Sequence, residues 1–274
     1  MEKMVSKLVF KMTLLMLMFQ LAKAAAPVAK PNCPDHCGNI SIPYPFGIGK
    51  YCYMAESYDV ECDETSKPPR AFLRSIKMEL VNITLTDGAA IVNGPIMSSN
   101  CSDRQSNLPA LNLTGSPFFF SFGNVFTAVG CNVRALLTGI GPQVVGCDST
   151  CSAEYNQKSL LYGQEINSLC ADGNCCVASA PYRMQVFQPS LEAKNGSEDS
   201  SGCKLAFLTD QNKFSFLNMT NPQALQYKDY VPANLGWLVN VNDSDISIYC
   251  KIHHNETLKS NINIIEGNPY FELG

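Results

Sequence analysis

The sequence has few of the residues on which most enzymes depend for catalysis. It contains one tryptophan and three histidines, His36, His253 and His254, in 274 residues. None of these histidines lies in a nucleophile-elbow or zincin motif, where a histidine would activate a nucleophile or bind a catalytic metal. The paired carboxylates of a glycosidase leave no reliable mark in a sequence, so that class stays open. We expect a protein that is not an enzyme and that requires no cofactor or metal.

The chain also lacks an excess of positive charge. It has 20 lysines and arginines against 24 aspartates and glutamates, which gives a formal net charge of −4. A protein that binds nucleic acid needs a basic surface, because the surface has to displace the counterions of the phosphates. Nucleic acid is therefore not an expected partner.

Beyond its N-terminus the sequence has no apolar run close to the roughly 20 residues that span a bilayer. At the N-terminus, three lysines precede an apolar run over residues 12–22, and Ala22-Lys23-Ala24 follows. A basic end, a short apolar run and small residues at an A-x-A site form a secretory signal peptide. Cleavage of residues 1–24 leaves 16 basic and 23 acidic side chains and a net charge near −7. We expect a secreted mature chain without a transmembrane helix.

Cysteine, by contrast, is abundant after the predicted cleavage site. Cytosolic proteins keep their thiols reduced and seldom carry so many, so we expect disulfide bridges formed in an oxidising compartment. The sequence does not give the pairing, and the odd count leaves one cysteine free, paired between chains or without its partner. Zinc is the alternative for the closely spaced pairs 33/37, 147/151 and 175/176, although histidines are scarce. The thirteen cysteines are Cys33, Cys37, Cys52, Cys62, Cys101, Cys131, Cys147, Cys151, Cys170, Cys175, Cys176, Cys203 and Cys250.

Eight N-x-S/T sequons, spread along the chain, also indicate export. A single sequon is weak evidence, but eight predict a surface broadly covered by sugars. Each glycosylated asparagine has to face solvent, which constrains the fold. The acceptor residues are Asn39, Asn82, Asn100, Asn112, Asn195, Asn218, Asn242 and Asn255.

Alternation of apolar and polar residues predicts strands. In residues 76–85 the alternation changes phase at Leu80-Val81, as a β-bulge would cause, and this turns Asn82 outward. Asp87-Gly88 predicts a turn, and Gly123-Asn124 predicts a two-residue hairpin turn between the apolar runs around it. With 16 prolines and 18 glycines as breaks, the sequence indicates a mainly β, disulfide-rich and loop-rich extracellular domain. Its length allows one large domain or two small β lobes.

The segment CPDHCGNISIPYPFGIGKYCYMAESYDVEC at residues 33–62 resembles the start of the galacturonan-binding domain of plant wall-associated receptor kinases. The CGN, PYPFG and following cysteine form a highly specific block, and the whole pattern is most similar to the wall-associated kinase-like branch. Shorter matching pieces follow in the same order: FLRSIKMELVNITL (72–85), FTAVGC (126–131), VGCDSTC (145–151), GNCC (173–176), GCKLAFL (202–208) and NLGWLV (234–239).

The resemblance implies an extracellular module that binds pectin and its oligogalacturonide fragments. In the family, EGF-like modules, a membrane helix and a cytoplasmic Ser/Thr kinase normally follow this domain. Here no cysteine follows Cys250, and a glycine-rich loop, HRD and DFG are missing, so we expect a member truncated before those regions. The expected segments are a signal peptide (1–24), an N-terminal leader (25–32), a galacturonan-binding-like β domain (33–188), a polar loop (189–202), a C-terminal part of the ectodomain (203–250) and a tail similar to the start of an EGF-like region (251–274).

Polygalacturonate is a repeating carboxylate, and arginine pairs with both oxygens of a carboxylate. The densest basic run lies at residues 67–77, and Lys50 beside the PYPFG segment extends it. On a strand, Arg70 and Arg74 would share a face about 13 Å apart; on a helix, both would share a face with Lys77. Either geometry predicts a row of positive charge. The candidate polysaccharide-binding residues are Lys50, Lys67, Arg70, Arg74 and Lys77.

Each of these features also has a simpler interpretation. A basic run is usually a solvated face. The acidic residues near it (Asp59, Glu61, Asp63 and Glu64) would allow calcium to bridge the protein to pectin, but they lack EF-hand spacing and are typical of a solvated face as well. The aromatic residues Tyr44, Phe46, Tyr51 and Tyr53 could stack on sugar rings, although packing in the core around Cys52 is the more common use of such residues.

The first functional hypothesis is therefore an extracellular module in the cell wall that binds pectin without turning it over. The second is an interaction protein, a soluble decoy or co-receptor that pairs with full-length receptor kinases through the odd cysteine. The third is a fragment of a full-length receptor Ser/Thr kinase.

Overall fold

The computed structural model describes residues 29–101, 110–121, 123–138, 145–151, 174–181, 183–194, 202–211, 225 and 228–240, and the backbone of 262–263 and 270–273. The predicted signal peptide lies outside these residues. Within them the regular structure is almost entirely β-strand, and the one helical element is the 3₁₀ turn η1 (Glu56–Tyr58). The prediction of a mainly β, disulfide-rich fold is confirmed.

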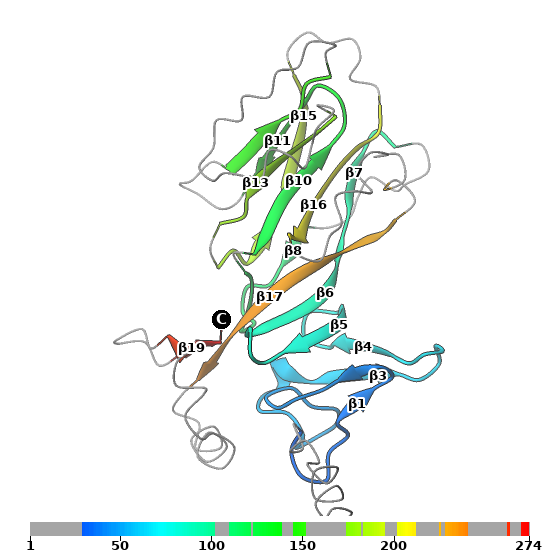
Figure 1. Ribbon diagram of the computed structural model, residues 1–274, viewed down its shortest axis with the longest axis vertical. Helices are drawn as coiled ribbons and strands as arrows, with labels where there is room; N and C mark the ends of the chain where they lie inside the picture. The colour runs from blue at the N-terminus through cyan, green and yellow to red at the C-terminus, as the bar shows by residue number, and fades with distance from the viewer. Residues whose placement is uncertain are drawn as a thin grey trace, which may run out of the picture.

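The largest sheet contains eight antiparallel strands, in the order β18-β19-β17-β6-β5-β4-β3, with β9 also paired to β17. Its strands are β3 (Val60–Asp63), β4 (Arg70–Leu73), β5 (Met78–Thr84), β6 (Ala89–Pro95), β9 (Phe118–Phe120), β17 (Tyr230–Asn240), β18 (Ile262–Asn263) and β19 (Tyr270–Leu273). The long strand β17 pairs with β6 in its first half and with β9 and β19 in its second half. In Figure 1 it runs obliquely between the lower and upper parts of the elongated molecule.

The upper part of the molecule holds two smaller sheets (Figure 1). One has the order β13-β10-β16-β7 and the other the order β12-β11-β15, while β1 with β2 and β8 with β14 form two-stranded pairs. The bounds are β1 (His36–Cys37), β2 (Ile40–Ser41), β7 (Met97–Ser99), β8 (Leu111–Asn112), β10 (Asn124–Val129), β11 (Val133–Leu137), β12 (Val145–Asp148), β13 (Cys175–Ser179), β14 (Val186–Phe187), β15 (Pro189–Ala193) and β16 (Lys204–Asp210).

The larger of two buried hydrophobic clusters joins the two parts. It contains Leu73 and Val92 from the large sheet together with Phe126 and Ala135 from the smaller sheets. At the large sheet, the fully buried Trp237 meets the ring of Phe46 edge to face at 5.1 Å, and Phe118 and Tyr58 complete the aromatic group. Because the two parts share this core, they are not lobes with separate interiors.

Five disulfides connect distant segments: Cys33–Cys52, Cys37–Cys62, Cys101–Cys203, Cys131–Cys151 and Cys147–Cys176. Cys175 is disulfide-bonded as well. Each member of the 33/37 and 147/151 pairs bonds a cysteine outside its own pair, so the zinc alternative is wrong for them. All eleven described cysteines are bonded, and the odd cysteine is therefore none of these; Cys170 and Cys250 lie outside the described residues.

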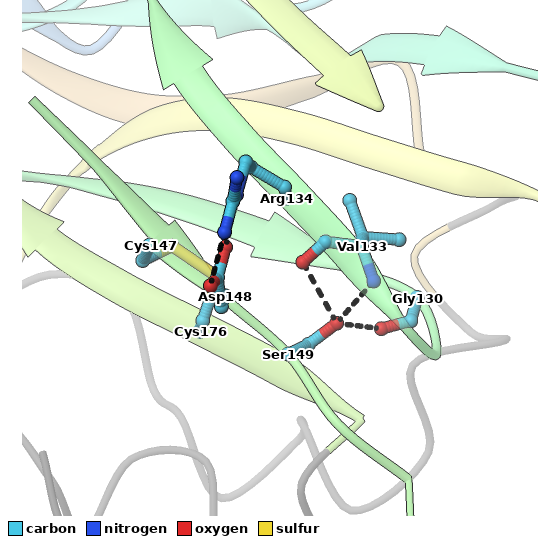
Figure 2. Close-up of a disulfide and its surroundings, with 7 residues drawn as sticks. All are labelled: Gly130, Val133, Arg134, Cys147, Asp148, Ser149 and Cys176. Atoms are coloured by element: carbon cyan, nitrogen blue, oxygen red, sulfur yellow. Dashed lines mark hydrogen bonds and ion pairs between the residues drawn. A yellow bond between two sulfur atoms is a disulfide. The ribbon is translucent and has the colours of Figure 1, made fainter. Parts of the chain in front are cut away.

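Figure 2 shows the bridge Cys147–Cys176, which ties β12 to β13 of the neighbouring sheet. Beside it, the buried hydroxyl of Ser149 donates to the carbonyl oxygen of Gly130 at 2.6 Å and accepts from the amide of Val133 at 3.1 Å. These bonds satisfy backbone groups that the turn before β11 leaves unpaired, which would otherwise be costly in a buried position.

Local sequence signals were accurate in β5 and its turn. The register of β5 against β6 shifts between Leu80 and Asn82, so the predicted bulge is confirmed, and Asn82 is exposed. The predicted turn at Asp87-Gly88 is present as well, with Gly88 at a φ of 55°.

Two predictions of local structure were wrong. The runs around Gly123-Asn124 form β9 and β10, but these do not pair as a hairpin; β9 pairs with β17, and β10 pairs with β13 and β16. The first part of the predicted polar loop, residues 189–193, is β15. This strand lies at the edge of its sheet, where proline at the first position is tolerated. Only Leu191 packs against the core, so the strand has the composition of a loop.

Candidate functional site

Of the predicted basic residues, only Arg70 lies on strand β4, and the pleat of the strand decides the side of the sheet to which it points. Ala71 and Leu73 are buried, whereas Arg70 is exposed and Phe72 half-buried. The alternation therefore places Arg70 and Phe72 on the side of the sheet that faces away from the core. Phe72 lies opposite Glu61 of β3 and opposite Glu79 of β5, so these acidic residues share that side.

Arg70 is held by a carboxylate of the next strand. Its Nε donates to Glu79 Oε1 at 2.6 Å and its Nη2 to Glu79 Oε2 at 2.5 Å, a bidentate pair. Glu79 Oε2 also accepts from Asn93 Nδ2 of β6 at 2.7 Å. The hydrogen bond from Arg70 lowers the pKa of Glu79 below its ordinary value. Underneath, the guanidinium carbon of Arg70 lies 5.3 Å from the centroid of the Phe72 ring.

Arg74 follows the end of β4 and turns toward the opposite neighbour. Its Nε donates to Asp59 Oδ2 at 2.7 Å, and its Nη1 donates to Glu61 Oε2 at 2.9 Å. The hydrogen bond to Asp59 is the main reason why the pKa of Arg74 is raised. Arg74 is thus anchored to β3 and the residue before it, whereas Arg70 is anchored to β5.

The structure therefore corrects the predicted row of positive charge. The helical alternative is wrong because residues 70–73 form a strand. The two arginines reach toward opposite neighbours, and the carboxylates of Asp59, Glu61 and Glu79 balance their charge. Sequence spacing along one strand could not show these partners, because they lie on the adjacent strands.

The three candidate lysines differ from the arginines. Lys50, Lys67 and Lys77 are exposed, and none of them forms an ion pair with another residue that the structure describes. Lys50 lies over the ring of Tyr51 at 5.1 Å. Lys67 precedes β4 and Lys77 follows it, so they lie beyond opposite ends of this short strand.

The arginines retain donors for a ligand. A guanidinium has five N–H groups, and the pair with Glu79 uses one on Nε and one on Nη2. The Nη1 end of Arg70 makes no hydrogen bond to a described residue. The Nη2 group of Arg74 likewise makes no hydrogen bond to a described residue, because Arg74 donates to Asp59 and Glu61 through Nε and Nη1. Each guanidinium is therefore fixed by protein carboxylates and can still donate outward.

The calcium alternative is not supported by the arrangement of the acidic residues. Asp59 and Glu61 bind Arg74, and Asp63 accepts hydrogen bonds from the amide and the hydroxyl of Thr65 at 2.9 and 2.6 Å. Among the described residues, no three acidic, cysteine or histidine side chains converge as a metal site would require.

The aromatic residues near Cys52 were expected either to pack in the core or to stack on sugar rings, and the structure separates them into two groups. Tyr44 and Phe46 are buried, which confirms core packing for these two. Tyr51 is 78% exposed and Tyr53 is half-buried. Sequence reasoning missed another exposed ring, Tyr230, which is 55% exposed at the start of β17. No local pattern marks Tyr230, because its neighbours belong to β6, far away in the sequence.

Four of the predicted glycosylation acceptors lie in described segments. Asn39, Asn82, Asn100 and Asn112 are all exposed, as attachment of a glycan requires. In the Asn112 sequon, Thr114 donates from its amide and its hydroxyl to Asn112 Oδ1 at 2.9 and 2.5 Å. The other four acceptors, Asn195, Asn218, Asn242 and Asn255, lie outside the described residues.

Fold and site together define a disulfide-bonded β module whose large sheet carries a polar, arginine-containing face. A family model described as "Wall-associated receptor kinase galacturonan-binding" matches residues 33–93, and one described as "Wall-associated kinase" matches residues 167–246. The chain belongs to the family of wall-associated receptor kinase-like proteins. Neither matched model is that of a kinase domain.

Curated relatives from Arabidopsis thaliana agree with the family models. Wall-associated receptor kinase-like 17 is 35% identical over 89% of this chain, and wall-associated receptor kinase-like 4 is 39% identical over 78% of it. The alignments cover 35% and 29% of these two relatives, so the chain spans about a third of their length. No solved structure matches the chain. Within the described segments, no helix has the length and apolar character of a membrane span.

Proposed function

We propose that the chain is the polysaccharide-binding module of a wall-associated kinase-like protein, that it is secreted to the cell wall, and that it binds pectin or oligogalacturonides without catalysis. The observation that carries the proposal is the position of the candidate residues. All five, Lys50, Lys67, Arg70, Arg74 and Lys77, lie within residues 33–93, the part that matches the galacturonan-binding model.

The geometry of the arginines suits a carboxylate ligand. Arg70 and Arg74 are positioned by Glu79 and by Asp59 with Glu61, and their outward N–H groups can donate to a uronate. Fixed side chains lose less conformational freedom on binding than mobile ones. Each exposed contact contributes about 1 kcal/mol or less, so affinity has to come from several contacts along one polymer. Such contacts weaken as salt is added.

The proposal is tested with a triple variant, Arg70→Gln, Arg74→Gln and Lys77→Gln, in the secreted chain. We expect its affinity for a de-esterified oligogalacturonide, measured by isothermal titration calorimetry, to fall about tenfold, because three contacts of roughly 0.5 kcal/mol are lost. Arg134→Gln is the matched control. Arg134 is an equally exposed arginine paired with Asp148, but it lies on β11, outside residues 33–93.

Thermal unfolding separates loss of binding from loss of fold. A triple variant that unfolds cooperatively and binds as tightly as the wild type would remove these residues from the site. An equal loss of affinity in Arg134→Gln would show that the effect is not local to β4.

A second candidate function rests on the cysteine count. The thirteen cysteines of residues 1–274 cannot all pair with one another, and all eleven that the structure describes are bonded. An odd cysteine can link the chain to a full-length receptor kinase or to a second copy, as expected of a decoy or co-receptor. Non-reducing electrophoresis of the secreted protein tests this. A reductant-sensitive dimer supports the interaction role, and a monomer contradicts the covalent form of it.

A further inference from the structure

The arginine site continues across the large sheet onto strands β6 and β17, which hold none of the candidate binding residues predicted from the sequence. We call the surface formed by Arg70, Phe72, Glu79, Asn93 and Tyr230 the outer face. Phe72 lies opposite Glu79, the side chains of Glu79 and Asn93 are hydrogen-bonded, and Asn93 lies opposite Pro232. The outer face therefore crosses four adjacent strands, β4, β5, β6 and β17.

Tyr230 lies at the β17 side of the outer face, farthest in strand order from Arg70 on β4. It lies opposite Pro95 of β6, two residues from the pairing of Asn93 with Pro232. Its ring is 55% exposed, which is unusual among the large apolar side chains of the described residues. Tyr230 is also close enough to Arg70 to contribute, after Glu79 and Asp63, to the raised pKa of that arginine. The ring and the guanidinium thus border the same surface.

The chemistry of the outer face fits a chain with both charged and uncharged sugars. An exposed tyrosine offers a flat apolar face and a polar tip, which suit the C–H face and the hydroxyls of a pyranose. The side chain of Asn93 donates to Glu79 through Nδ2 and makes no other hydrogen bond to a described residue. Because Glu79 balances the charge of Arg70, the face carries little net charge, and an uncharged sugar beside a uronate encounters no unpaired ion there.

We propose that the outer face binds partly methyl-esterified galacturonan, with Arg70 taking a free carboxylate and Tyr230 stacking on a neighbouring esterified ring. This inference rests on the proposed function and adds a residue that decides specificity. It divides recognition into two contributions: a salt-sensitive one from Arg70 and a salt-insensitive one from Tyr230, because stacking of a neutral ring is not screened by ions.

The experiment uses two oligogalacturonides of equal length, one fully de-esterified and one fully methyl-esterified, titrated into the secreted chain at low and high salt. Tyr230→Ala should weaken binding of the esterified probe about three- to tenfold at both salt concentrations. Tyr230→Phe should retain most of the affinity, because the ring remains. Arg70→Gln should weaken only the de-esterified probe. Arg134→Gln is the control, because Arg134 is an exposed residue on β11, outside the outer face and outside residues 33–93.

The outcomes distinguish the two proposals. If Tyr230→Ala binds the esterified probe as the wild type does, or if Arg134→Gln is equally impaired, the stacking role of Tyr230 is overturned. Salt-sensitive binding of the de-esterified probe by the wild type would still leave the proposed function standing. If the wild type binds neither probe, the proposed function itself fails. Weaker binding of the esterified probe in Tyr230→Ala with unchanged binding in Arg134→Gln supports the inference.

Discussion

Two arginine–carboxylate pairs in this molecule each join adjacent strands but differ in their surroundings. Arg70 and Glu79 join β4 to β5 at 2.6 and 2.5 Å, while Arg134 and Asp148 join β11 to β12 at 3.1 and 3.3 Å (Figure 2). The side chain of Glu79 is 18% exposed, and that of Asp148 is 38% exposed.

The difference lies in what supports each pair. Asn93 donates to Glu79, and the Phe72 ring lies beneath Arg70, so the guanidinium is fixed from two sides. Arg134 has neither support, and its pair lies beside the Cys147–Cys176 bridge. An arginine fixed in one orientation is suited to binding, whereas an exposed pair of ordinary geometry contributes little to stability or recognition. Under the proposed function, β4 therefore belongs to the binding surface, whereas β11 and β12 do not.

The largest expected effect comes from removing the bridge in the second region. Replacing Cys147 and Cys176 by serine should lower the free energy of unfolding by about 2–4 kcal/mol, because the unfolded chain regains the freedom that the bridge removed. Urea unfolding measures this change. Affinity for a de-esterified oligogalacturonide should stay at the wild-type value under conditions where the variant is folded. A loss of affinity in the folded variant would contradict the division between the two regions.

A smaller effect is expected from Glu79→Gln, which removes the positioning carboxylate. The hydrogen bond from Arg70 lowers the pKa of Glu79 below 4.5 in the folded protein. The pair therefore stabilises the fold above pH 4.5, and this stabilisation is lost as the pH falls through the lowered pKa. At pH 7 the variant should lose less than about 1 kcal/mol, and the difference from the wild type should vanish in strong acid.

Asp148→Asn is the matched control for that measurement, and urea unfolding across a pH series compares the two variants. Because the Asp148 pair is longer and more exposed, its variant should lose less stability at pH 7 than Glu79→Gln. Equal losses in the two variants would mean that the support from Asn93 and Phe72 has no energetic consequence.

The smallest expected effects concern the sequons. Asn82 lies on β5 of the large sheet and Asn112 on β8, and both are exposed. Asn82→Gln and Asn112→Gln should each remove the mass of one glycan from the secreted protein, as mass spectrometry would show. Each should change the free energy of unfolding by less than about 0.5 kcal/mol, since surface substitutions seldom do more. An unchanged mass for either variant would show that the sequon is not used.

Local signals in the sequence predicted the structural features that depend only on residues close together in the chain. The phase change at Leu80-Val81 gave the bulge, and Asp87-Gly88 gave the turn that follows β5. The cysteine count predicted bridges without their pairing, since pairing depends on contacts such as the one between Cys101 and Cys203, 102 residues apart. β15 was missed because an edge strand needs only one apolar residue on the core side.

The candidate site was predicted less completely, for the same reason. Arg70 and Arg74 were identified from charge spacing, but their partners lie 9 to 15 residues away on adjacent strands, and only the strand register reveals them. Asn93 meets the site because β6 pairs with β5. Tyr230 meets it because β17 pairs with β6, a strand far away in the sequence, and no local pattern encodes that pairing.

The most direct test of the account is a titration of the secreted wild-type chain with de-esterified oligogalacturonide at increasing salt, beside the Arg70/Arg74/Lys77 and Arg134 variants. The account predicts saturable binding that weakens with salt, is reduced about tenfold in the triple variant and is unchanged in Arg134→Gln. Binding of the same strength in all three proteins, or no binding by the wild type, would contradict it.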